Sequence, residues 1–235
     1  MPIQIERKHL PWVVGAVVLA GSVVAQLTIQ MLTNVATSAM WIPNLLTVKG
    51  RLAKSIMDQF GAFVNEASAM YAIPQKLIVA EIIKESTGNP TIRGKSGEYG
   101  LMQLMPGTAR WVAKQLGRKD YRPGTIADVE LNTQFGAYYF KYWFDRLERM
   151  PALAAAAYNA GPGRAQAGRA GAPLEGAVWV ETIPFNETRD YVKKVLANAM
   201  VYARALDQTF VPLTTRLGTV PPRGNGAGVA VAATD

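Results

Sequence analysis

Glu85 is the residue of this sequence best placed for acid–base chemistry, because it ends the apolar stretch "LIVAEIIK" near the end of a predicted helix. Apolar neighbours and the negative end of a helix dipole both raise the pKa of a carboxyl group. Glu81 lies one turn earlier and adds a like charge if both side chains point the same way. A carboxyl group that stays protonated near neutral pH can act as a general acid. The helix alone, however, favours a solvated glutamate paired with Lys84 or Lys76.

Helix signals around Glu85 predict the elements that must position it, in a mainly α fold. Strand signals are weak, and Ala, Leu, Met and Gln are common in the middle of the chain. The glycine-dense loop over residues 86–107 carries apolar residues, and we expect a short β-hairpin in it. Thr108 is the expected N-cap of the helix after this loop. Caps and stop residues predict helices over residues 75–86, 109–116, 129–148, 151–161 and 187–206.

Composition excludes several classes of site. The 235-residue chain has no cysteine, which removes disulfides, thiolate metal sites and cysteine nucleophiles. The single histidine, His9, lies outside the predicted domain, which argues against Ser-His-Asp chemistry and histidine metal sites. The net charge of +8 suits an anionic polymer. Because the Lys and Arg residues are scattered, we expect cell wall or membrane rather than nucleic acid.

The N-terminal region is predicted to enter a membrane. Residues 11–32 are uncharged, mostly apolar and long enough to span a bilayer. Arg7 and Lys8 precede them, which predicts a cytoplasmic N-terminus and an exported remainder. An uncleaved anchor, a signal peptide cut after Ala25 and a buried helix are the competing interpretations. We favour the anchor, because the apolar character continues past Ala25.

Four segments follow from these signals. Residues 1–48 are the membrane anchor or signal segment, and residues 49–64 are a connector that contains an amphipathic stretch. Residues 65–206 are the folded domain. Residues 207–235 are rich in Gly, Pro and small side chains and predict a flexible tail.

Four motifs in order around and after Glu85 resemble a known family. They are "ES" followed by "NP", then "GEYGLMQLMP", then "AAAAYNAGPGRA", then "IPFNETRDYVKKVL". The chain resembles the soluble-lytic-transglycosylase type of catalytic domain over about residues 65–205. The resemblance implies a lysozyme-like helical fold with a peptidoglycan cleft, and cleavage of the β-1,4 bond between N-acetylmuramic acid and N-acetylglucosamine. It implies a 1,6-anhydro product, with Glu85 as the single catalytic acid and then base.

The resemblance also assigns the other motif residues. Met102 and Gln103 would line the sugar site, and Gln103 needs hydrogen-bond partners within its apolar run. Tyr158 and Asn159 would contact the glycan, the alternative being a packed tyrosine and a helix C-cap. Tyr191 matches a substrate-site tyrosine whose hydroxyl lies near the catalytic carboxylate and could orient it. Apolar neighbours in the loop are expected in the core, namely Leu101, Leu104 and Met105.

A second carboxylate in a matching motif is not found. Glu81 and Glu98 are the auxiliary candidates, and Glu81 occupies a position that the resemblance predicts to be apolar, so it faces solvent or tunes Glu85.

The alternative functions are those of a lysozyme-type peptidoglycan hydrolase and of a non-catalytic wall-binding scaffold. We expect the protein in the inner membrane, with its catalytic domain in the periplasm. The alternatives are export after signal cleavage and a phage virion that acts on the host envelope. The partners considered besides peptidoglycan are a secretion system and a phage virion complex. No metal or organic cofactor is implied.

Overall fold

The computed structural model describes residues 48–167, 169, 171–206 and 217–222, which form a mainly α domain. The predicted membrane segment, residues 11–32, and its interpretation as anchor or signal lie outside the described residues. Within the described ranges, no helix combines the length and apolar character needed to cross a membrane.

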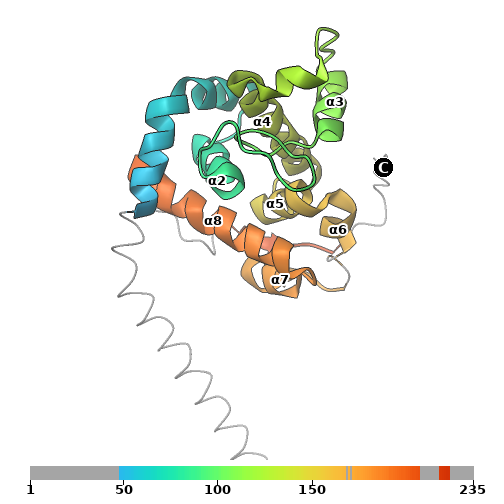
Figure 1. Cartoon of the computed structure of the whole chain (residues 1–235). Helices are drawn as coiled ribbons and strands as arrows, with labels where there is room; N and C mark the ends of the chain where they lie inside the picture. Colours follow the sequence, from blue (N-terminus) through green and yellow to red (C-terminus); the bar gives the residue numbers. More distant parts are fainter. Residues whose placement is uncertain (1–47, 168, 170, 207–216, 223–235) are drawn as a thin grey trace, which may run out of the picture. The chain divides into compact units, whose positions relative to one another are not determined.

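Helices make up almost all of the domain (Figure 1). A helix over residues 48–71 is followed by α2 (Gln75–Ser86), α3 (Pro106–Gln115), the 3-10 helix η2 (Pro123–Ala127), α4 (Val129–Arg146), α5 (Pro151–Ala160), α6 (Pro162–Ala167), α7 (Gly176–Thr182) and α8 (Asn186–Leu206). Two short strands, β1 (Leu174–Glu175) and β2 (Thr219–Val220), pair antiparallel, with Leu174 opposite Val220.

Local chemistry sets several of these helix ends. Asp128 caps α4, since its side chain accepts a hydrogen bond from the backbone N–H of Leu131 at 2.8 Å. Gly161 ends α5 with a φ of 84°, a left-handed value that glycine adopts without strain. The prediction that Thr108 caps the helix after the loop is wrong, because α3 already begins at Pro106, where proline suits the first turn.

The helix of Glu85, α2, lies inside the domain and packs most extensively against α8. Alanine-rich α5 packs against α4, α6 and α8, and its alanines are buried. Figure 1 shows α2 beside α8, with the glycine-dense loop running across it. These contacts place the C-terminal end of α2 between α8 and the loop.

Residues 49–64 are part of the domain, so the prediction of a connector is wrong for them. They are helical, and Ala53, Ile56 and Val64 are buried in the main hydrophobic core. Lys49 also donates a hydrogen bond to Oδ1 of Asn198 on α8, at 2.8 Å. The amphipathic pattern of this stretch serves core packing.

The strand pairing differs from the expected arrangement. The loop over residues 86–107 holds only isolated antiparallel bridges, Arg93 with Tyr99 and Tyr99 with Leu104. The two-stranded sheet instead involves β2, which belongs to the segment predicted as a flexible tail. For residues 217–222 that prediction is wrong, because Leu217 and Val220 are buried and the carbonyl of Pro221 accepts a hydrogen bond from Arg169.

Candidate active site

The turn after α2 fixes the position of Glu85. Thr87 adopts a left-handed conformation, with a φ of 55°, and its N–H bonds to the carbonyl of Ile83. The Ser86 hydroxyl donates to the carbonyl of Ile82 at 2.9 Å and accepts from the N–H of Gly88 at 3.1 Å. The helix therefore stops one residue after Glu85, in a hydrogen-bonded turn.

A tyrosine from the last long helix lies between two carboxyl groups of α2. The Tyr191 hydroxyl lies 2.5 Å from Oε1 of Glu85, and it also contacts Oε2 of Glu81. Glu81 and Tyr191 are both only 1% exposed. The expectation that the Tyr191 hydroxyl lies against Glu85 is confirmed. Because the rest of Tyr191 is buried, we assign it to positioning Glu85 and not to glycan contact.

Burial dominates the electrostatics of Glu85. The pKa of its carboxyl group is raised to about 7, chiefly by loss of water and in smaller part by the negative charges of Glu98 and Glu187. The hydrogen bond from Tyr191 and the positive charge of Lys84 act in the opposite direction. Glu85 is thus poised to hold or release a proton near neutral pH, as a general acid and base requires.

Glu81 is more strongly perturbed. Its complete burial and the nearby charge of Glu85 raise its pKa well above the ordinary value. Its Oε1 atom is buried and has no hydrogen-bond partner among the described residues. The sequence left two interpretations of Glu81, that it faces solvent or that it tunes Glu85. The first is wrong, because the side chain is buried.

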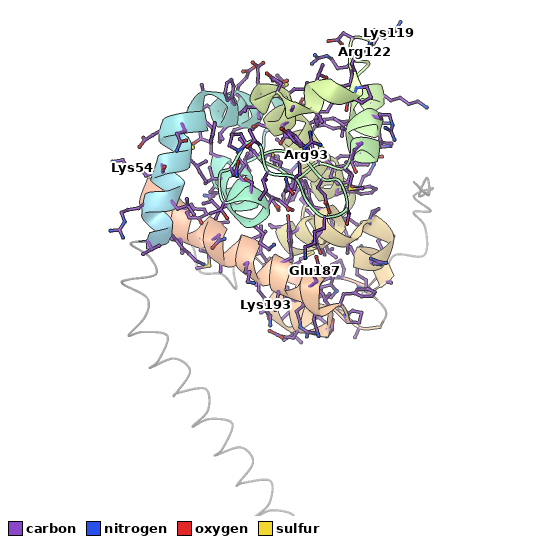
Figure 2. All side chains as sticks on the ribbon, viewed as in Figure 1. Lys54, Arg93, Lys119, Arg122, Glu187 and Lys193 are labelled. Carbon is purple, nitrogen blue, oxygen red and sulfur yellow. The ribbon has the colours of Figure 1, made fainter. Side chains whose placement is uncertain are left out.

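Lys84 on α2 and Glu187 on α8 both act electrostatically on Glu85. The Lys84 ammonium lies 4.7 Å from the centre of the Tyr191 ring. Glu187, labelled in Figure 2, lies in the first turn of α8, and Arg93 lies on the loop. The Arg93 guanidinium stacks over the Tyr99 ring at 4.7 Å. Charge of both signs therefore borders the end of α2.

Asn132, which the sequence analysis did not single out, holds the loop to α4. Its Oδ1 accepts from the N–H of Met102 at 2.9 Å, and its Nδ2 donates to the carbonyls of Tyr99 and Ile126. A Cβ added to Gly100 would lie 2.5 Å from Nδ2 of Asn132, so this close approach requires glycine. The available signal was a polar residue on an otherwise apolar helix face.

Met102 serves packing of the loop. Its side chain is 0% exposed and covers Gly136 of α4, where an added Cβ would lie 2.4 Å from the Met102 sulfur. Its carbonyl accepts a hydrogen bond from the Tyr158 hydroxyl at 2.8 Å. The expected contact between Met102 and a sugar is therefore not supported, because no part of the side chain is accessible.

Gln103 and Glu98 both fold back on the loop. The Gln103 amide donates to the carbonyls of Ile92 and Gly100, at 3.1 and 2.9 Å, which supplies the partners expected for this residue. Glu98 accepts from the N–H of Ser96 at 3.0 Å. Gln103 is only partly buried, and its backbone φ of 43° is left-handed.

Tyr158 and Asn159 lie at the C-terminal end of α5 and are both partly exposed. The Tyr158 hydroxyl is already used to hold Met102. The structure thus brings Glu81, Glu85, Tyr158 and Tyr191 into one electrostatically coupled group. Contacts of Gln103 and Asn159 with a glycan stay predictions.

The mainly helical domain, with Glu85 near the end of the buried helix α2, has the lysozyme-like class of fold. Residues 62–173 match the Transglycosylase SLT domain, and residues 182–210 match the Soluble lytic transglycosylase helical domain. Residues 62–173 are therefore an SLT domain of the lytic transglycosylase type.

Known relatives support this assignment. The chain is 36% identical over 169 residues to the soluble lytic murein transglycosylase of Salmonella typhimurium, and this match covers 69% of the chain and 26% of the relative. The 70 kDa soluble lytic transglycosylase of Escherichia coli is 34% identical, with a TM-score of 0.61, over 68% of this chain and 26% of that one. An inactive glutamate-to-glutamine mutant of Slt from Pseudomonas aeruginosa is 33% identical, with a TM-score of 0.61. The match covers 65% of this chain and 25% of that one. The chain spans about a quarter of the length of these relatives.

Proposed function

We propose that this protein is a peptidoglycan lytic transglycosylase that cleaves the β-1,4 bond between N-acetylmuramic acid and N-acetylglucosamine. The observation that carries the proposal is Glu85, which is mostly buried, bonded to Tyr191, and has a pKa of about 7. The SLT domain and the murein-cleaving names of its relatives support the substrate.

Glu85 acts first as an acid. Its proton passes to the glycosidic oxygen while the bond from that oxygen to the anomeric carbon breaks. The substrate's own N-acetyl group stabilises the positive charge that develops on the sugar. A pKa near the working pH allows Glu85 to carry the proton and then to leave it with the departing sugar.

Glu85 acts next as a base. The ionised carboxylate takes the proton of the 6-hydroxyl on the muramoyl residue, and that oxygen bonds to the anomeric carbon. The product is the 1,6-anhydro ring, and Glu85 has its proton back. The Tyr191 hydroxyl, 2.5 Å from Oε1, stabilises the ionised form between these two steps.

A transglycosylase needs one carboxylate, whereas most glycosidases place two about 5–9.5 Å apart on either side of the scissile bond. Glu81 is the carboxyl group that shares a partner with Glu85, and it is only 1% exposed. A buried group cannot reach a sugar or activate water. This favours chemistry assisted by the substrate over the two-carboxylate hydrolase.

Mass spectrometry of digested peptidoglycan tests the proposal. We expect the wild-type protein to release products lighter by one water than the hydrolytic ones, and Glu85→Gln to release none while remaining folded. Products carrying only a free reducing end would replace the assignment with a hydrolase. Full activity of Glu85→Gln would mean that another residue is the acid. Glu181→Gln, an exposed carboxylate on α7 paired with Lys193, is the matched control.

We also propose that residues 11–32 anchor the protein in the inner membrane, with the catalytic domain in the periplasm. The support is their apolar length and the basic residues before them. Fractionation of cells that express a C-terminally tagged chain tests this. A full-length product in the membrane fraction is expected, and a shorter soluble product would favour a cleaved signal peptide.

A further inference from the structure

Glu81 has no part in the steps above, yet it touches the same hydroxyl as Glu85. The order of contacts is Glu81 Oε2, Tyr191 hydroxyl, Glu85 Oε1, which we call the carboxyl–hydroxyl chain. A tyrosine hydroxyl carries one proton and can donate one hydrogen bond. Both contacts can be hydrogen bonds only if one carboxyl group is protonated and donates to the tyrosine oxygen.

Burial decides which carboxyl group that is. Glu81 is 1% exposed, and its second oxygen, Oε1, is buried without a partner among the described residues. An ionised carboxylate in this position would be strongly unfavourable, because it is removed from water and one of its oxygens has no partner among the described residues, whereas the neutral acid is tolerated far better. Glu85 is partly exposed, and its Oε2 is not among the buried unpartnered atoms of the described residues. The neutral acid is therefore Glu81.

We propose that Glu81 is a positioning residue that stays protonated and donates to the Tyr191 oxygen, so that the tyrosine donates to Oε1 of Glu85. The inference rests on the proposed role of Glu85. With Oε1 occupied as an acceptor, Oε2 is the oxygen that exchanges the proton with the substrate. A chain of donors in one direction also strengthens the bond that the ionised Glu85 accepts.

The surrounding charges agree with this order. The groups that face Glu81 are Glu85 and Lys84 on its own helix, Tyr191 on α8 and Tyr158 on α5. Burial is the largest cause of the raised pKa of Glu81, and the charge of Glu85 raises that pKa further. The additional charges that act on Glu85 are Glu98 and Glu187.

No net proton transfer is required of the chain. Glu85 gives its Oε2 proton to the glycosidic oxygen and recovers one from the 6-hydroxyl of the muramoyl sugar. Glu81 and Tyr191 keep their protons throughout both steps. Their contribution is the direction of the hydrogen bonds, which stays the same whether Glu85 is neutral or ionised.

Infrared spectroscopy tests the protonation of Glu81 without any assay of activity. At about pH 8, one unit above the pKa of Glu85, we expect the carbonyl band of a buried carboxylic acid in the wild-type protein and in Glu85→Gln. The band should be absent in Glu81→Gln. In Glu85→Gln combined with Tyr191→Phe it should move to higher frequency, because the buried acid of Glu81 loses its acceptor. Absence of the band from the wild-type protein would overturn the proposal.

Two substitutions of Glu81 test its link to catalysis. The amide of Glu81→Gln can still donate to the Tyr191 oxygen, and we expect kcat within about twofold of wild type. Glu81→Met has similar length and no donor, and we expect kcat to fall about tenfold, the effect of one net hydrogen bond. Equal activity of both variants would reduce Glu81 to a packing role and refute the proposal.

The pH profile of kcat/KM separates a neutral Glu81 from an ionised one. A neutral Glu81 predicts that the alkaline limb of Glu81→Gln stays where it is in the wild-type protein. An ionised Glu81 predicts that both substitutions move the limb to lower pH, because both remove a negative charge beside Glu85. If the wild-type protein makes anhydro products but both substitutions move the alkaline limb to lower pH, the proposal about Glu81 fails while the proposed function stands.

Discussion

The Tyr191 hydroxyl is expected to lower the pKa of Glu85, so its removal should move the pH dependence of the enzyme. The hydroxyl lies 2.5 Å from Oε1 of Glu85 and stabilises the ionised form. Hydrogen bonds to charged groups contribute about 1.5–3 kcal/mol, and one pKa unit corresponds to about 1.4 kcal/mol. Tyr191→Phe should therefore raise the pKa of Glu85 by about one to two units above its value of about 7.

The assay is the pH dependence of kcat/KM for soluble peptidoglycan fragments. Activity requires protonated Glu85 for the first step, so the alkaline limb reports the pKa of this residue in the free enzyme. In Tyr191→Phe the limb should move to higher pH by the amount above. The maximal kcat should fall, because the ionised intermediate state of Glu85 loses its partner.

Tyr202→Phe is the matched control on the same helix. Tyr202 is fully buried, and its hydroxyl has no hydrogen-bond partner among the described residues. It is eleven residues beyond Tyr191 on α8, about 16 Å along the helix, so its removal should leave the profile unchanged. A limb in Tyr191→Phe that stays in place, or moves to lower pH, would refute the account of Glu85.

Three further predictions concern stability and the loop. The pKa of Glu85 is raised from 4.5 to about 7, which stabilises the folded state below about pH 4.5, and this contribution is lost as the pH rises through 7. In urea unfolding, the free energy of unfolding of the wild-type protein, relative to that of Glu85→Gln, should fall by about 3 kcal/mol over that range. Asn132→Ala leaves three backbone groups without this partner, two of them in buried hydrogen bonds, and thermal unfolding should show the free energy of unfolding fall by about 3 kcal/mol. Gly136→Ala forces Met102 to move, because the new Cβ would lie 2.4 Å from its sulfur; activity should fall about tenfold or more, while Gly107→Ala, with open space around its Cβ, should keep full activity.

Much of the site could be predicted from local sequence. The spacing of Glu81 and Glu85 places both carboxyl groups on one face of a helix, and the apolar stretch before them indicates burial. The tyrosine hydroxyl that joins the two carboxyl groups could not be predicted from their spacing, since Tyr191 lies 106 residues after Glu85. Only the packing of α8 on α2 shows that a single hydroxyl contacts both acids.

The boundaries of the domain were less predictable. Residues 49–64 have the periodic apolar pattern of a packed helix, but the resemblance to the family covers only residues from about 65 onward. The resemblance therefore predicts the start of the domain too late. β2 was missed because two residues form it and their partners in β1 lie more than forty residues earlier. Such distant pairing leaves no local signal in a segment rich in Gly and Pro.

We expect a hydroxyl of the substrate, and not water, to complete the reaction begun by Glu85. Digestion of peptidoglycan in water enriched in oxygen-18 tests it directly. We expect products with an anhydro end and no oxygen-18 from the solvent, and Glu85→Gln should abolish their formation. Incorporation of one solvent oxygen at the new sugar terminus of each product would contradict it and identify a hydrolase.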